Sequence, residues 1–216
     1  MEEMSAVGIA GRSTIDRSAI AGSLPELADH LAAIAPGRLA IIAGDEVYAS
    51  QAAAEVAKLA ESFGTPVYGS SWPSRIPFPT SHPLWAGNLP TKASGIAEIL
   101  GAYDAIFALG GKSLITILYS DGPAVPKGCR VYQLSADVRD LGRTYETPLS
   151  VVGEIKASLR MLQPHLENVT APKREAYAAL LRKAERDRAS ARQALSDAAE
   201  ASIDAPTIPP FVAARE

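Results

Sequence analysis

The sequence is poor in the residues that build disulfides, metal centres and strongly charged surfaces. Its 216 residues include one cysteine, Cys129, and three histidines. A single cysteine excludes an internal disulfide, and the three scattered histidines match no zinc-ligand spacing. With a net charge of -3 and a pI near 5.7, the chain has no broad attraction for nucleic acid or an anionic membrane. We therefore expect no metal site in this chain, and neither nucleic acid nor a membrane as its partner.

Long hydrophobic runs are also missing. No stretch approaches the roughly 20 apolar residues that a membrane helix requires. The N-terminal run MEEMSAVGIAGRS carries acidic residues where a signal peptide needs basic ones. We therefore expect a cytoplasmic protein.

Strand-length apolar runs alternate with segments of helical period through most of the chain. The expected strands are 38–44, 66–68, 104–109, 130–134 and 149–152. The expected helices are 24–36, 50–63, 92–100, 137–141 and 154–162, the last ending at Pro164. This alternation predicts an α/β fold: a Rossmann-like, doubly wound, mostly parallel sheet of about five or six strands, with helices on both faces.

The C-terminal part differs in composition. Residues 172–201 are rich in Ala, Arg, Lys and Glu, with a narrow apolar stripe, which predicts a solvated or loosely docked helical extension. We expect four segments: a linker from a preceding domain at 1–22, a central Rossmann-like domain at 23–166, a helical extension and linker at 167–207, and the start of a truncated following domain at 208–216.

The turns that follow the strands are the expected ligand positions in such a sheet. The first turn, AGDEVYAS, carries Asp45 and Glu46 where a pyrophosphate would sit, so its charge opposes phosphate. The third turn begins Gly110-Gly111-Lys112-Ser113, which resembles half of a phosphate-binding loop, although paired glycines commonly serve only a tight strand exit. Asp137 follows another strand and suits either a ribose contact or a helix cap.

A long proline-rich loop, within residues 65–90, carries the remaining candidate. Its prolines exclude helix and favour extended backbone, and loops of this length inside a compact domain are usually functional. It contains Arg75, Phe78, His82 and Trp85. His82 is a candidate general acid, general base or carboxylate-binding group, because imidazole titrates near neutrality.

Four runs in series resemble the central domain of thiamine diphosphate-dependent enzymes, especially the benzoylformate decarboxylase-like group. They are RLAIIAGDEV, the stretch ESFGTPVYGSSWPSRIPFPTSHPLWAGNLP, YDAIFALGGKS, and RVYQLSADVRDLGRTYETPLSVVG, which together cover about residues 38–153. The resemblance is carried chiefly by PFPTSHPLWAG and SADVRDLGR.

The resemblance implies a parent enzyme of three α/β domains, a lyase of the 2-oxo acid decarboxylase type or a transferase of the carboligase type. Thiamine diphosphate and Mg²⁺ would be bound by the two outer domains, whose catalytic glutamate and GDG-type motif are not in this sequence. In that group the histidine of the PFPT-x-HP run reaches the active site, and here it is His82. The parent is expected to be a homodimer or homotetramer, and the isolated chain to be inactive.

Two other functions stay open on the sequence. One is a free-standing module that binds ADP, FAD or NAD through Gly110, Gly111 and Asp137. The other is a scaffold that assembles oligomers through the helix at 172–201.

Overall fold

The computed structural model describes residues 20–202. Most of the expected linker at 1–22, the last residues of the expected extension at 167–207, and the expected domain start at 208–216 lie outside them. Its strands are β1 (Leu39–Ala43), β2 (Val67–Gly69), β3 (Trp85–Asn88), β4 (Ala105–Leu109), β5 (Arg130–Ser135) and β6 (Leu149–Val152). Its α-helices are α1 (Leu24–Ala32), α2 (Asp45–Ala49), α3 (Ala53–Phe63), α4 (Ala93–Leu100), α5 (Ile155–Thr170) and α6 (Arg174–Ala201), with short 3₁₀ turns η1 (Val138–Asp140) and η2 (Ala171–Lys173).

The six strands form one parallel sheet in the order β3-β2-β1-β4-β5-β6. The chain runs outward from β1 to β3, then returns to β4 on the other side of β1 and runs outward again. The direction of winding therefore reverses between β1 and β4, which is the topological switch point of a doubly wound sheet. The predicted Rossmann-like class is confirmed.

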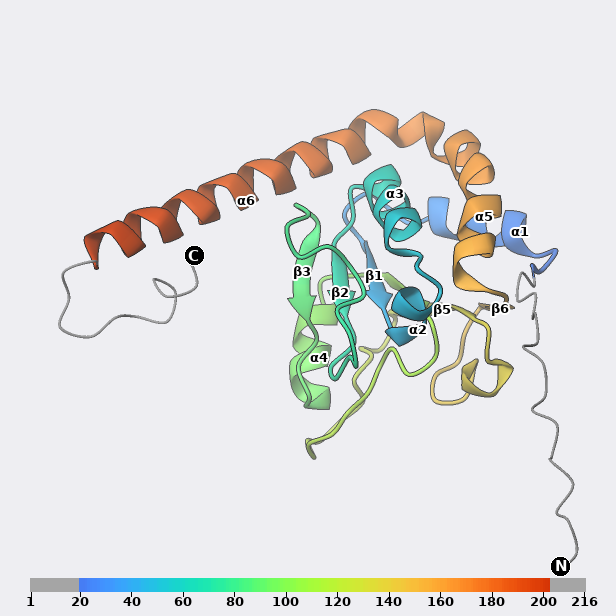
Figure 1. Ribbon diagram of the computed structural model, residues 1–216. Coiled ribbons are helices and arrows are strands. Elements are labelled where there is room, and N and C mark those ends of the chain that lie inside the picture. Colours follow the sequence, from blue (N-terminus) through green and yellow to red (C-terminus); the bar gives the residue numbers. More distant parts are fainter. Residues whose placement is uncertain (1–19, 203–216) are drawn as a thin grey trace, which may run out of the picture.

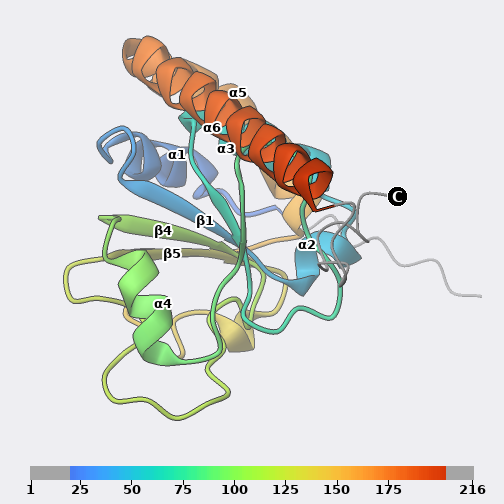
Figure 2. The same cartoon turned by 90° about the vertical axis from the view of Figure 1, so that its left-hand side faces the viewer.

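Helices cover both faces of the sheet (Figures 1 and 2). Helices α1, α3 and α5 pack on one face, over the side chains of Leu39, Ile41 and Phe107. Helix α4 covers the other face, over Ile42 and Ile106. Because neighbouring strand residues point to opposite faces, the fully buried central strands read as continuous apolar runs.

Helix α6 crosses over α3 and extends past the β3 edge of the sheet (Figure 1). Its first turns dock through Tyr177, which is buried and packs edge-on against Phe63 with 5.4 Å between ring centroids. Leu180 and Leu181 are partly buried against the same core. The expected loosely docked helix is thus anchored at its N-terminal end.

Three local expectations were wrong. The loop expected within residues 65–90 contains the edge strand β3, whose residues alternate between half-buried and exposed, so the strand lacks a fully apolar signature. The helix expected from residue 50 begins at Ala53 and is preceded by α2. Helix α5 does not end at Pro164 but continues to Thr170, because apolar residues on both sides of the proline, Leu162 and Leu166, remain buried in the core.

Candidate functional site

A cleft with a volume of about 940 Å³ lies at the carboxyl edge of the sheet. It lies where the chain leaves β1, β4 and β5, at the switch point where doubly wound sheets bind ligands. Two of the predicted nucleotide candidates, Gly111 and Asp137, line it. The other lining residues are Asp45, Glu46, Ala49, Ser50, Ser70, Lys112, Ile115, Ala136, Val138, Arg139, Asp140, Glu154, Ile155 and Lys156.

Glu46 bridges the ends of β4 and β5 at this cleft. Its Oε1 accepts hydrogen bonds from the Gly111 amide at 2.7 Å and from the Ser135 hydroxyl at 2.7 Å. Its Oε2 accepts from the Ala136 amide at 2.9 Å. The Gly111 amide, the expected phosphate donor, is therefore already bonded to a carboxylate of the chain itself.

Asp137 is the helix cap rather than an open ribose ligand. Its carboxylate accepts from the backbone amide of Arg139 at 3.0 Å, which caps η1, and pairs with the Arg139 guanidinium at 2.8 Å. These hydrogen bonds from Arg139 lower the pKa of the Asp137 carboxyl to about 2. The prediction that Asp137 caps a helix is confirmed. A contact of Asp137 with a nucleotide ribose stays a prediction.

The residues around the cleft do not fit thiamine diphosphate or its metal ion. The amides that could hold a phosphate are bonded to Glu46, and further carboxylates border them, so a diphosphate would meet negative charge. Within residues 20–202 there is no group of three or more His, Cys, Asp or Glu side chains that could hold a metal ion. The same residues include no helix long and apolar enough to cross a membrane.

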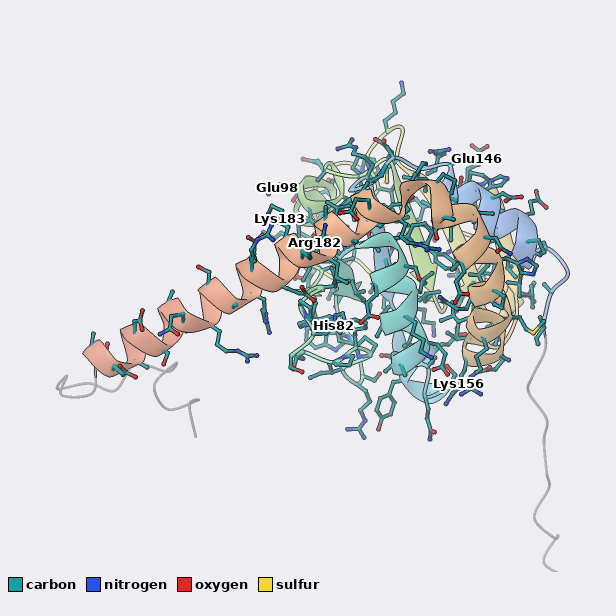
Figure 3. All side chains as sticks on the ribbon, turned by 90° about the horizontal axis from the view of Figure 1, so that it is seen from above. His82, Glu98, Glu146, Lys156, Arg182 and Lys183 are labelled. Atoms are coloured by element: carbon teal, nitrogen blue, oxygen red, sulfur yellow. The ribbon has the colours of Figure 1, made fainter. Side chains whose placement is uncertain are left out.

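His82 lies at the opposite, amino edge of the sheet. It precedes β3 by three residues, and the Trp85 amide donates to the His82 carbonyl at 3.0 Å. Because all strands are parallel, the start of β3 is on the edge away from the strand exits. In Figure 3 the labelled His82 lies beside α3, apart from Lys156 of the cleft. The structure thus brings Gly110, Gly111 and Asp137 together but not His82.

Both ring nitrogens of His82 have partners. Nδ1 accepts from the Leu84 amide at 3.2 Å, so a neutral ring carries its proton on Nε2, which lies 3.1 Å from Oε1 of Glu61 in α3. Phe78 packs edge-on against the imidazole, with 5.0 Å between ring centroids. The side chain is 15% exposed. His82 is therefore held in one orientation, with Nε2 as its donor.

Sequence reasoning missed Glu46 and Glu61 as partners of the candidate residues. Glu46 was recognisable as a charge at a strand exit, but its bonds to Gly111 and Ala136 join residues 65 and 90 positions away. Glu61 is separated from His82 by 21 positions and lies on the exposed side of α3. No local signal in the sequence specifies either pairing.

The sheet order, the two-sided helical cover and the cleft at the switch point define a Rossmann-like, doubly wound domain. A family model described as the thiamine pyrophosphate enzyme central domain matches residues 25–162, more than half of the chain. The chain therefore belongs to the family of thiamine pyrophosphate enzyme central domains.

Individual relatives agree with this family. The chain is 32% identical to a sulfoacetaldehyde acetyltransferase from Alcaligenes xylosoxydans xylosoxydans over 133 residues, which is 60% of this chain and 22% of that protein. It is 28% identical to a benzoylformate decarboxylase from Pseudomonas aeruginosa over 138 residues, which is 63% of this chain and 26% of that protein. The matched region thus spans about a quarter of the length of these curated relatives.

A solved structure shows the same arrangement. The thiamine diphosphate-dependent 4-hydroxybenzoylformate decarboxylase of Rhodococcus jostii RHA1 superposes with a TM-score of 0.64 at 26% sequence identity. The match covers 72% of this chain and 29% of that one. The likeness therefore covers most of this chain and leaves most of the decarboxylase without a counterpart here.

Proposed function

We propose that this chain serves as the central structural domain of a larger thiamine diphosphate-dependent enzyme of the 2-oxo acid decarboxylase or carboligase type. The observation that carries the proposal is the family match over residues 25–162 combined with coverage of only 22 to 26% of the curated relatives. The domain spaces the flanking domains, which bind thiamine diphosphate and Mg²⁺, and the parent assembles as a homodimer or homotetramer in the cytoplasm.

The donor sets support this division of labour. The carboxyl-edge cleft presents a carboxylate on its phosphate-binding amides, and the described residues hold no metal-ligand cluster. Thiamine diphosphate, when bound in the parent, would supply an electron sink for the negative charge that develops at the carbonyl carbon of the substrate. This chain positions the flanking domains and contributes His82.

His82 is proposed to orient the substrate or to transfer a proton in the parent. Its Nδ1 is bonded to the Leu84 amide, so Nε2 is the atom that can hold or deliver a proton. Its loop lies at the amino edge, beneath α6, and the ring retains some exposure there. Glu61 fixes the direction of Nε2 in the isolated domain and would have to release it, or relay its proton, when a substrate binds.

The test uses the protein encoded by the complete reading frame, assayed with benzoylformate in the presence of thiamine diphosphate and Mg²⁺. We expect thiamine diphosphate-dependent turnover, and we expect His82→Ala to lower kcat about 100-fold or more. The neighbouring Ser81→Ala is the matched control and should keep kcat within about twofold, with unchanged thermal stability. His82→Ala also loses the bonds to Leu84 and Glu61, so its kcat is measured at a temperature at which circular dichroism shows the variant folded.

Two results would contradict parts of this proposal separately. A kcat for His82→Ala within twofold of wild type would remove the histidine from the chemistry while leaving the family role intact. Turnover of benzoylformate or pyruvate by the 216-residue chain alone would overturn the assignment as a structural domain.

A further inference from the structure

The floor of the carboxyl-edge cleft has the geometry of an anion site. Two backbone amides, of Gly111 and Ala136, converge there with the Ser135 hydroxyl from the ends of β4 and β5. Converging amides at the switch point are the usual cradle for a phosphate group. In this chain all three donors are bonded to the carboxylate of Glu46.

We propose that Glu46 is a built-in anion that holds the phosphate position of the switch point, so that the cleft rejects phosphate-bearing ligands. A phosphate at the floor would have to displace Glu46 and would then face the displaced negative charge. The residue thereby determines which ligands the cleft accepts: groups without a phosphate at the floor.

The paired glycines fit this role. Gly110 has a φ of +87°, and a Cβ at this position would lie 2.9 Å from the Cβ of Glu46. At Gly111 a Cβ would collide with the Asp140 side chain. A side chain at residue 110 would push Glu46 off its donors. The Gly110-Gly111 turn, which resembles half of a phosphate-binding loop, therefore accommodates the carboxylate of Glu46.

The other carboxylates at the cleft are bonded elsewhere. Asp45 accepts from the amide and hydroxyl of Ser74, Asp137 pairs with Arg139, and Glu154 accepts from the Ala157 amide at the start of α5. Asp140, whose side chain borders Gly111, lies 3.8 Å from the Arg143 guanidinium. Glu46 is therefore the side chain whose removal frees the floor donors without releasing a loop or a helix cap.

The experiment compares the thermal unfolding midpoint of the 216-residue chain, Glu46→Ala and Glu98→Ala in rising inorganic pyrophosphate at constant ionic strength. Glu98 is an exposed residue on α4, outside the cleft, and reports the general effect of the salt. We expect pyrophosphate to raise the midpoint of Glu46→Ala by at least about 3 °C more than that of the other two proteins. Broadening of the ³¹P resonance of pyrophosphate should follow the same order.

A folded Glu46→Ala protein whose midpoint follows wild type would overturn the proposal, and so would equal stabilisation of all three proteins. Should the alanine variant be unfolded in plain buffer, pyrophosphate should restore its native circular dichroism. Failure of both Glu46→Ala and Glu46→Ser to regain structure with pyrophosphate would also count against an anion position at the floor.

Discussion

Asp137 shows how one carboxylate can serve structure at a position where related folds use it for a ligand. It caps η1 and pairs with Arg139, whose hydrogen bonds favour its ionised form. Because the pair is largely open to solvent, its contribution to stability is screened by salt and water. Its clearest effect should be a dependence of stability on pH.

We predict that Asp137 contributes stability that is fully present above its ordinary pKa of 3.8 and is lost as pH falls toward about 2. The sign follows because the folded state binds the proton less readily than the unfolded state. The measurement is the thermal midpoint of wild type and Asp137→Asn from pH 6 to pH 2. The gap between them should be constant above about pH 5 and shrink below pH 4, whereas a constant gap down to pH 2 would contradict the assignment.

The residues that complete each candidate site were not predictable from local sequence. The strand-exit positions of Gly111 and Asp137 follow from periodicity and turn chemistry, and the cleft indeed forms there. The bonds of Glu46 and Glu61 depend on which loops the tertiary fold brings together. Charge next to a strand exit can be read from a sequence, but its partner across the sheet cannot.

Helix α5 is an element in which packing overrides a local stop signal. Pro164 lacks the N–H that an interior helix residue donates, at a typical cost of about 3 kcal/mol. The helix nevertheless continues, because Leu159, Leu162 and Leu166 are buried on one side of it. A prediction from the proline alone therefore placed the end of the helix too early. Strand β3 was missed for a different reason, because it has no apolar run.

Replacement of this proline should stabilise the domain. Pro164 is exposed, so Pro164→Ala removes little packing while it restores a backbone donor. We expect the free energy of unfolding to rise by about 1 kcal/mol or more, measured by urea denaturation. An unchanged or lower unfolding free energy would show that α5 has adapted its backbone to the proline.

The docking of helix α6 depends on Tyr177. Its ring packs against Phe63 and is buried, while its hydroxyl has no hydrogen-bond partner among the described residues, and burial raises its pKa. We predict that Tyr177→Ala costs about 3 kcal/mol, because it removes a buried aromatic ring. Tyr177→Phe keeps the ring and should lie within about 1 kcal/mol of wild type, or above it.

Urea denaturation of the two Tyr177 variants distinguishes ring packing from polar bonding. Equal losses for alanine and phenylalanine would mean that the hydroxyl, rather than the ring, holds α6 on α3. A loss below about 1 kcal/mol for alanine would mean that the helix rests only loosely on the domain.

At the scale of the whole domain, the two candidate sites, the cleft and His82, lie at opposite edges of one sheet. The cleft with the Glu46 carboxylate lies at the carboxyl edge. The loop of His82 lies at the amino edge and contacts α6, where Arg188 donates to the Thr80 carbonyl. The chain matches about a quarter of the length of its curated relatives. These observations support the proposal that the chain frames the active site of a larger enzyme and contributes His82 to it.

The most direct test of this account is a thermal-shift panel on the purified chain with thiamine diphosphate plus Mg²⁺, ADP, FAD and NAD. A ligand that binds only the folded state, at 100 times its dissociation constant, adds about 2.7 kcal/mol of stability, which is readily detected. We expect no shift of the unfolding midpoint with any of the four. A shift with ADP, FAD or NAD would mean that the cleft accepts a nucleotide past Glu46, and a shift with thiamine diphosphate would contradict the central claim outright.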